Sequence, residues 1–432
     1  MKITQITPGS GDNFYCENCL RDQALLRTLH AQGHHAKMVP LYLPIKFDSP
    51  NISMDAPIFY GGVNVYLQQK IGLFRKTPRW LDSVFDNRAL LSRVSRKAGM
   101  TNSRELGETT LSMLKGEDGR QVKELDRLVE WLSQDMNKPD MIILSNVLLG
   151  GLTAALKRRL QVPVVSLLQD EEAFIDGLGE PYREEAWGLL RKCCQDMDAL
   201  IAVSRSYADR IAPKLDLDEN RLHTSYMGID IDEYQPADSP PDRPTIGFLS
   251  RMCPERGLDT LVDAFIMLKR NPELTNCQMQ ISGGKSQADE SFFRLIRRRL
   301  ETAGVAEDVI FMPEFLGEKR KQWLKELTVM CVPEKEEAAY GLFALEAQAA
   351  GVPIVVPKIG IFPELIELTG GGLLVEFNSP RFFSAVLSPL LLDSGSAHEL
   401  GQQGRRGMKE HFDVHKTTAN LIDLLNEIIQ RA

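Results

Sequence analysis

The sequence predicts an α/β protein built from two doubly wound domains. Short β-branched runs alternate with amphipathic stretches along most of the chain, which is the pattern of parallel sheets covered by helices. A proline-rich stretch at 235–244 interrupts this alternation, as a linker would. The length of 432 residues also exceeds what one ordinary core supports, so two domains are expected.

Residues 1–236 are expected to form the first domain. Its strands are predicted, in order, at Lys2–Thr7, His35–Leu43, Met141–Ser145, Val162–Leu168, Ala199–Ser204 and Leu222–Met227. A helix from Cys19 to Gln32 separates the first two strands, because its apolar residues recur at helical spacing and a glycine ends the pattern. Residues 45–135 break the alternation and predict an insertion of mostly helical character.

Residues 245–414 are expected to form the second domain. Its strands are predicted, in order, at Thr245–Ser250, Gln278–Ser282, Val309–Pro313, Val329–Pro333, Pro353–Pro357 and Gly372–Val375. Residues 415–432 predict a helix that crosses back to the first domain. Because ligands of such sheets bind at the carboxyl ends of the strands, the loops after these strands hold the candidate functional residues.

The bulk composition excludes several classes of function. A formal net charge of −8 argues against a nucleic-acid-binding surface, which needs a basic face. No apolar run reaches the roughly 18 residues of a membrane span. The first residues are too polar for a secretory signal. We therefore expect a cytoplasmic protein with at most peripheral membrane contact.

Seven cysteines at irregular spacing favour a reducing compartment over a disulfide framework. Cys16 and Cys19 are the one suggestive pair, but a zinc site would need two more ligands, and no second CxxC occurs. No metal site is therefore expected. The pair is interpreted as two thiols at the start of a helix. A redox pair remains open, because a helix N-terminus lowers the pKa of a thiol.

The first chemical motif follows the strand expected at Thr245–Ser250. Arg251 and Arg256 stand at the end of this strand, five positions apart. Two guanidinium groups placed there can hold a diphosphate through charge-assisted, bidentate hydrogen bonds. The alternative is that both arginines are solvated loop charges.

The second motif surrounds a helix that begins near Gly341. The free N–H groups and the dipole at a helix start favour an anion. Glu346 lies on this helix among apolar neighbours, where a carboxylate is costly unless it has a partner. A ribose diol would serve as that partner. The alternative is a buried glutamate paired with another group of the protein.

These motifs occur in one order and at one spacing, together with Ser282-Gly283-Gly284 and Gly360…Pro363-Glu364. The set resembles family 4 of the glycosyltransferases, the retaining sucrose-synthase- and glycogen-synthase-like group of the GT-B fold. The resemblance spans nearly the whole chain except the insertion. It implies two Rossmann-like domains facing each other across a cleft, with no catalytic metal or cofactor.

The resemblance also implies roles for individual residues. It implies that Arg251 and Arg256 bind the diphosphate and that Glu346 binds the ribose. It also implies that Gly9 and Gly11 lie close to the phosphate or the sugar. The rest of the expected donor-binding set is Gly283, Pro313, Gly341 and Leu342.

The chain departs from the family pattern at three places. The family has a second glutamate eight positions before Glu346, where this chain has Ala338; an extra loop residue would let the adjacent Glu337 reach the sugar. The family usually has lysine where Arg256 stands, which changes the geometry of the charge. Many members have histidine where this chain has Gln169. Asp170 is then the candidate to orient the acceptor hydroxyl, or it simply caps the strand end.

The expected function is retaining, metal-independent transfer of a sugar from a nucleotide-diphosphate-sugar to a carbohydrate or lipid-linked acceptor. One alternative is an inactive sugar-nucleotide-binding protein, which Ala338 and Gln169 favour. Another is an epimerase or phosphorylase of the same fold, but the acid and histidine set that such enzymes need is not evident. The insertion carries aromatic and basic residues that suit an acceptor or form a solvated helical face: Phe74, Arg75, Lys76, Arg79 and Trp80.

Overall fold

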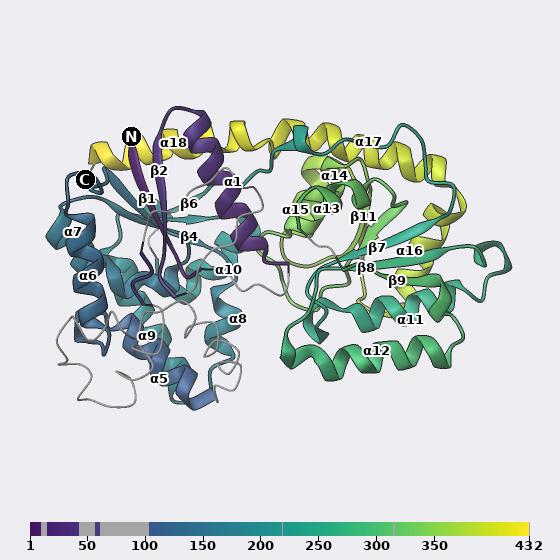
Figure 1. The fold of residues 1–432 in the computed structure, drawn as a ribbon, viewed down its shortest axis with the longest axis horizontal. Coiled ribbons are helices and arrows are strands. Elements are labelled where there is room, and N and C mark those ends of the chain that lie inside the picture. Colours follow the sequence, from purple (N-terminus) through teal and green to yellow (C-terminus); the bar gives the residue numbers. More distant parts are fainter. Residues whose placement is uncertain (10–14, 43–56, 61–102, 218, 314–315, 432) are drawn as a thin grey trace. The chain divides into compact units, whose positions relative to one another are not determined.

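The computed structural model describes residues 1–9, 15–42, 57–60, 103–217, 219–313 and 316–431. The chain divides into two compact units (Figure 1). The first comprises Met1–Ser10, Leu25–Ser225 and Asn420–Ala432. The second comprises Gly11–Ala24 and Tyr226–Ala419, so it includes a short segment that the sequence analysis placed in the N-terminal domain.

A parallel six-stranded sheet in the order β2-β1-β3-β4-β5-β6 forms the centre of the first unit. The strands are β1 (Lys2–Thr7), β2 (His35–Pro40), β3 (Met141–Leu144), β4 (Val164–Leu168), β5 (Ala199–Ala202) and β6 (Leu222–Thr224). Strands β3, β4 and β5 are buried along their whole length, because helices cover both faces of a parallel sheet and its strands are then apolar runs.

Helices accompany these strands along the chain. They are α1 (Glu17–Ala31), α5 (Ser103–Leu114), α6 (Val122–Leu132), α7 (Thr153–Leu160), α8 (Glu171–Asp176), α9 (Tyr182–Asp196) and α10 (Arg205–Leu215). Helices α5 and α6 lie in the predicted helical insertion, of which residues 57–60 and 103–135 are described. The proposed acceptor residues at 74–80 lie outside the described residues.

The second unit has a parallel six-stranded sheet in the order β12-β11-β10-β7-β8-β9. Its strands are β7 (Thr245–Leu249), β8 (Gln278–Ser282), β9 (Val309–Phe311), β10 (Val329–Cys331), β11 (Ile354–Pro357) and β12 (Gly372–Val375). The chain runs outward from β7 to β9 and then returns to the other side of β7 with β10. The loops that follow β7 and β10 therefore leave neighbouring strands at the point where the strand order reverses, which is where doubly wound sheets bind ligands.

Helices cover both faces of the second sheet. They are α11 (Leu258–Leu268), α12 (Glu290–Thr302), α13 (Gly317–Leu324), α14 (Leu342–Ala349), α15 (Phe362–Thr369), α16 (Pro380–Leu392) and α17 (Ser394–His411). Helix α18 (Val414–Arg431) begins in the second unit, and its residues from Asn420 on belong to the first unit. Figure 1 shows α11 and α12 on one side of this sheet and α14 and α15 on the other. The predicted α/β class with two parallel sheets is confirmed.

Helix α14 is the most deeply buried of these helices that bear on the site. All its residues are buried, including the polar Glu346 and Gln348. A helix that is apolar on nearly every side belongs in the interior of a domain. A carboxylate carried by such a helix must find its partners inside the protein.

Candidate functional site

An ion pair joins the loops after β7 and β10 in the second unit. Arg256 follows β7, and its Nη1 donates a hydrogen bond of 2.7 Å to Oε1 of Glu334, which follows β10. Burial raises the pKa of the Glu334 carboxyl, although the Arg256 charge opposes this shift. The other oxygen, Oε2, is buried without a hydrogen-bond partner among the described residues. Glu334 was not among the predicted site residues, and its only signal in the sequence is its place directly after an apolar strand.

A second ion pair connects the loops after β7 and β8. Arg251 donates to both carboxylate oxygens of Asp289, from Nε at 2.8 Å and from Nη2 at 3.0 Å, and its Nη2 also contacts the Ser286 hydroxyl at 3.0 Å. Burial would raise the pKa of Asp289, but the hydrogen bonds from Arg251 and Ser286 outweigh burial and hold it below the usual value. The bidentate contact fixes the plane of the guanidinium group.

Both predicted phosphate-binding arginines therefore lie at one edge of one sheet, and neither is a solvated loop charge. Their side chains are 37% and 32% exposed for Arg251 and Arg256, and each has a buried carboxylate as partner. A phosphate group that binds there must share these guanidinium groups with Asp289 and Glu334 or take them over.

Backbone packing at the same edge depends on Gly257. Its φ of +71° is in the left-handed region, and a Cβ at this position would lie 1.8 Å from the carbonyl oxygen of Pro333. Only glycine permits this approach of the two loops. The close approach sets the short distance between Arg256 and Glu334.

Glu346 accepts hydrogen bonds from two buried tyrosines of the second unit and forms an ion pair with a buried arginine. The Tyr15 hydroxyl donates to Oε2 at 2.8 Å, and the Tyr234 hydroxyl donates to Oε1 at 2.6 Å. Nη2 of Arg320 lies 3.0 Å from Oε1 in an ion pair whose side chains are each 2% exposed. Burial first, and then the Glu346 charge, raises the pKa of both tyrosines, so both remain hydroxyl donors at neutral pH.

These contacts give Glu346 protein partners, as one of the sequence-based alternatives foresaw. They do not by themselves exclude the ribose, because a ribose hydroxyl is the same kind of donor as a tyrosine hydroxyl. The sequence analysis missed Tyr15, Tyr234 and Arg320. They are remote from Glu346 in the chain, and no local pattern connects them with it.

The loop before α14 carries the residues expected to contact the sugar. Glu337 is exposed, whereas Ala338 is buried and its carbonyl oxygen accepts a hydrogen bond of 2.9 Å from the N–H of Ile361. Gly341 occupies the N-cap position of α14 with a φ of +67°, and Leu342 begins the helix, as predicted. The assignment of Glu337 to the sugar remains a prediction.

The other predicted donor-binding residues are more dispersed. Gly283 follows β8, and its carbonyl oxygen accepts a hydrogen bond of 2.8 Å from the N–H of Tyr15. Pro313 is exposed, just before two residues that are not described. Gly9 belongs to the first unit with a φ of +98°, and Gly11 lies outside the described residues.

Asp170 belongs to an acidic cluster at the end of β4 in the first unit. It has a φ of +55° and precedes α8, but its side chain makes no capping hydrogen bond. Its Oδ1 lies 3.6 Å from Nη2 of Arg210, and Nε of the same arginine lies 2.5 Å from Oε1 of Glu172. The Asp170 side chain is 36% exposed and thus accessible to a ligand.

Neighbouring residues of the cluster have structural roles. The Gln169 amide donates to the carbonyl oxygen of Ser145 at 2.8 Å. Glu171 is fully buried, which raises the pKa of its carboxyl, and it accepts a hydrogen bond of 2.6 Å from the Tyr207 hydroxyl. Arg210 and Tyr207 lie on α10 and were not foreseen from the sequence.

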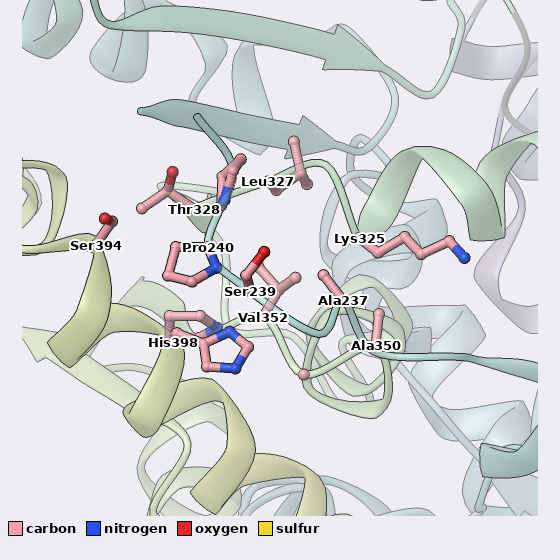
Figure 2. Close-up of a pocket in the computed structure, with 13 residues that line it drawn as sticks. Ala237, Ser239, Pro240, Lys325, Leu327, Thr328, Ala350, Val352, Ser394 and His398 are labelled. Carbon is pink, nitrogen blue, oxygen red and sulfur yellow. The ribbon is translucent and has the colours of Figure 1, made fainter. Parts of the chain in front are cut away.

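A small pocket lies at the opposite end of the second sheet (Figure 2). Thr328 precedes β10 and Val352 precedes β11, so the pocket lies at the amino ends of these strands. The pocket is also lined by Ser239 and Pro240 of the proline-rich stretch and by His398 of α17. Doubly wound sheets bind ligands at the carboxyl ends of their strands, so this pocket is separate from the candidate site.

One sequence-based expectation about the cysteines is wrong. Cys16 and Cys19 form a disulfide at the start of α1, where two free thiols were expected. The other cysteines are free and buried: Cys193, Cys194, Cys253, Cys277 and Cys331. The spacing argument failed because it tested for a framework of several bridges and not for a single bridge within one helical turn.

Two further findings concern metals and membranes. Among the described residues, no group of three or more His, Cys, Asp or Glu side chains is arranged to hold a metal ion. Within the same part of the chain, no helix is both long and apolar enough to cross a membrane. Metal independence remains a prediction.

Comparison with known families gives two adjacent matches. Residues 108–233 match the model described as Glycosyltransferase Family 4, and residues 230–407 match the model described as Glycosyl transferases group 1. A D-inositol 3-phosphate glycosyltransferase of Xylanimonas cellulosilytica is 28% identical over 249 residues, which are 54% of this chain and 58% of the relative. Its counterpart in Streptomyces avermitilis is 26% identical over 221 residues, 48% of this chain and 47% of the relative. The chain thus spans about half the length of the curated relatives it matches.

Solved structures show the same fold at low identity. Sucrose-phosphate synthase of Thermosynechococcus elongatus has a TM-score of 0.70 at 16% identity, with all of both chains covered. Anabaena HepE in complex with UDP-glucose has a TM-score of 0.67 at 14% identity, with 99% of this chain and 100% of that chain covered. These structures show that the chain has the GT-B fold. The two family matches together cover residues 108–407, and by them the chain belongs to the glycosyltransferases of family 4 and group 1.

Proposed function

We propose that the chain is a retaining glycosyltransferase that moves a sugar from a nucleotide-diphosphate-sugar to a carbohydrate or lipid-linked acceptor without a metal ion. The observation that carries the proposal is the placement of Arg251 and Arg256 at the reversal point of the second sheet. Glu346 lies on helix α14 of the same unit. A structural neighbour was solved in complex with UDP-glucose, which supports this class of donor.

The proposed chemistry needs charge stabilisation at the leaving group. The bond between the anomeric carbon and the phosphate oxygen breaks, and its electron pair stays with the phosphate. The acceptor oxygen forms the new bond, and its proton passes to the leaving phosphate oxygen. The negative charge that develops on the leaving phosphate is stabilised by Arg251, Arg256 and the N-terminus of α14. Asp289 and Glu334 hold the guanidinium groups in place before the donor arrives.

Asp170 is the proposed positioning residue for the acceptor hydroxyl. Its carboxylate is partly exposed, and its Oδ1 lies 3.6 Å from Nη2 of Arg210. An ionised carboxylate accepts the hydrogen bond of an alcohol and orients its oxygen for attack. We expect Asp170→Asn to lower turnover more than it changes donor affinity.

The first test separates the role of Arg256 from the burial of Glu334. Removing Arg256 alone would leave a buried carboxylate without its partner, so the double variant Arg256→Met/Glu334→Gln is compared with Glu334→Gln. The double variant should lose about 2–4 kcal/mol of affinity for UDP, GDP or ADP, whichever the protein binds. Glu334→Gln should bind at least as well as the unchanged protein, because it frees the arginine. Calorimetric titration measures both.

An arginine at the far end of β7 provides the control. Arg243 donates to Asp308 at 2.7 Å, so Arg243→Ala removes a similar ion pair without touching the candidate site. Its nucleotide affinity should equal that of the unchanged protein. Equal affinity of the double variant and Glu334→Gln would refute phosphate binding by Arg256.

The second test concerns the reaction itself. Release of free sugar from the correct nucleotide-sugar, at a rate that a chelator does not change, would support metal-independent transfer. Proton magnetic resonance of the first product formed gives the anomeric configuration, which must equal that of the donor in a retaining reaction. An inverted product or a chelator-sensitive rate would contradict the corresponding part of the proposal.

An inactive sugar-nucleotide-binding protein is the second candidate, and the buried Ala338 favours it. Glu337 and Glu336 are adjacent and both exposed, so each serves as the control of the other. Glu337→Ala should lower turnover and weaken the choice between sugar epimers, while Glu336→Ala should not. Nucleotide binding without any turnover in the unchanged protein would favour the inactive protein.

A further inference from the structure

Tyr15 forms a hydrogen bond with one oxygen of the Glu346 carboxylate, the group that is proposed to bind the ribose. Its hydroxyl donates to Oε2 of Glu346 at 2.8 Å, and its N–H donates to the carbonyl oxygen of Gly283 at 2.8 Å. The Arg320 guanidinium lies over its ring, with the guanidinium carbon 5.7 Å from the ring centre. The Tyr15 side chain thus stands where a nucleotide would need to bind.

Tyr234 occupies the other oxygen of Glu346, so two hydroxyls contact the carboxylate as the vicinal diol of a ribose would. The segment around Tyr234 is held by further contacts. Arg405 donates to its carbonyl oxygen at 2.6 Å, and the Lys321 ammonium lies 5.9 Å from its ring centre. Tyr15 has contacts of the same kind, but it adjoins the Cys16–Cys19 disulfide, so it is the tyrosine that we expect to leave when a nucleotide binds.

The residue after Tyr15 is one half of the Cys16–Cys19 disulfide. The bridge closes the first turn of α1, and both cysteines are partly exposed. The remaining cysteines are buried, and burial raises the pKa of the thiol at each of them. A reductant or alkylating reagent should therefore reach Cys16 and Cys19 before any other described cysteine.

We propose that Cys16 and Cys19 are a redox-active pair that controls access of the nucleotide ribose to Glu346 through Tyr15. This inference rests on the proposed function. In the disulfide state the bridge fixes the start of α1, and Tyr15 stays on Glu346. In the dithiol state the first turn of α1 is no longer held by the bridge. Tyr15 then leaves Glu346, and a ribose hydroxyl donates to the carboxylate in its place.

The redox step is an exchange with a dithiol reductant, a small molecule or the dithiol of another protein. One reductant thiolate attacks a sulfur of the bridge and forms a mixed disulfide, which the second reductant thiolate then resolves. Two electrons and two protons pass to Cys16 and Cys19. The products are two cysteine thiols and the disulfide of the reductant.

The first measurement tests the pair without any nucleotide. The folded full-length chain is treated with dithiothreitol, quenched with iodoacetamide and analysed by peptide mass spectrometry. We expect alkylation of Cys16 and Cys19 only after reduction, with Cys193 and Cys253 unmodified in both samples. A bridge that resists reduction until the protein unfolds is purely structural, and this result would overturn the inference.

The second measurement compares nucleotide binding in the two states by calorimetric titration with UDP, GDP and ADP. The reduced protein should bind its preferred nucleotide about tenfold more tightly, the effect of removing one competing hydrogen bond to a charged group. Equal affinities would overturn the inference but leave the proposed function intact. Binding of no nucleotide in either state, with the bridge still reducible, would instead refute the proposed function and with it the link to ribose.

Two variants test the route through Tyr15. Tyr15→Phe keeps the packed ring and the disulfide but removes the hydroxyl, so it should bind nucleotide tightly whether oxidised or reduced. Tyr226→Phe is the control, because Tyr226 also donates to a carboxylate of the second unit, that of Glu364. It should keep the tenfold difference between the two states. A difference that persists in Tyr15→Phe would overturn the proposed route.

Discussion

At the scale of single residues, Glu346 is a buried carboxylate with a polar partner at each oxygen. Its two oxygens receive two tyrosine hydroxyls and one guanidinium group, all in the interior of the second unit. A buried ion pair adds little compared with an apolar pair of the same shape, but the loss of one partner leaves the other uncompensated. Removal of the negative charge at Glu346 should therefore lower the free energy of unfolding of the second unit strongly.

We expect Glu346→Gln to lower the free energy of unfolding by roughly 3–5 kcal/mol, because the buried Arg320 charge would lose the carboxylate with which it forms an ion pair. Urea unfolding followed by circular dichroism measures the loss. Glu376→Gln is the control, since Glu376 pairs with Lys358 on the surface, where a pair contributes about 0–1 kcal/mol. Equal losses in the two variants would mean that Arg320 finds another partner.

Asp289 gives a prediction for pH. Its folded pKa lies below the usual value, so the Arg251–Asp289 pair stabilises the protein above the unfolded pKa of about 4 and is lost as the pH falls through the folded pKa. Between neutral pH and about pH 3, Asp289→Asn should therefore lose less stability than the unchanged protein. Urea unfolding at a series of pH values measures the two slopes. Parallel slopes would contradict the lowered pKa.

The sequence alone located one side of each of these pairs. Arg251 and Arg256 were predictable because strand ends and charge can be recognised locally, and Glu346 because a lone acid interrupts an apolar helix. Their partners are 38, 78 and 331 positions away in Asp289, Glu334 and Tyr15. No periodicity relates residues at such separations, so only the folded chain identifies them.

At the scale of elements, strand positions were predictable to within a few residues, and element ends were not. The apolar run predicted as a strand at Val329–Pro333 contains β10, which ends at Cys331 because ladder pairing stops before the apolar residues do. Helix α8 (Glu171–Asp176) was not predicted from the sequence, although Glu171 and Glu172 stand in its first turn. Acids in a first helical turn favour the helix, and this signal was overlooked.

The approach of the loops after β7 and β10 yields a prediction about Gly257. Gly257 and Gly304 share a φ of +71°, but only at Gly257 would an added methyl carbon have neighbouring atoms within 4 Å. Gly304→Ala should cost about 1–2 kcal/mol from backbone conformation alone. Gly257→Ala should cost more and should also lower nucleotide affinity, because the methyl group would push the Pro333 carbonyl away. Thermal unfolding and nucleotide titration of both variants measure the difference, and equal costs would show that the loops can separate freely.

At the scale of the whole molecule, each unit has its own sheet and core, so we expect each to unfold in its own thermal transition. A nucleotide bound by the second unit should raise only the transition of that unit. At a ligand concentration 100 times Kd, the added stability is about 2.7 kcal/mol. Scanning calorimetry with and without the preferred nucleotide measures the two shifts. Equal shifts of both transitions would indicate that the units unfold together.

Neither unit is one continuous piece of chain. The second unit includes Gly11–Ala24 as well as Tyr226–Ala419, and the sequence analysis had no means of seeing this division. Local patterns show where a strand or helix lies, but they do not show which core a short connecting segment joins.

The contact between Tyr15 and Glu346 also has a consequence for biosynthesis. The two residues are separated by 331 positions, and ribosomes add about 5–20 residues per second. Roughly 15–65 s therefore pass between the synthesis of Tyr15 and that of its partner. During this interval Cys16 and Cys19 meet the surrounding thiols and oxidants while α14 does not yet exist. The redox state of the compartment thus acts on the nascent chain before the finished carboxylate site can influence the bridge.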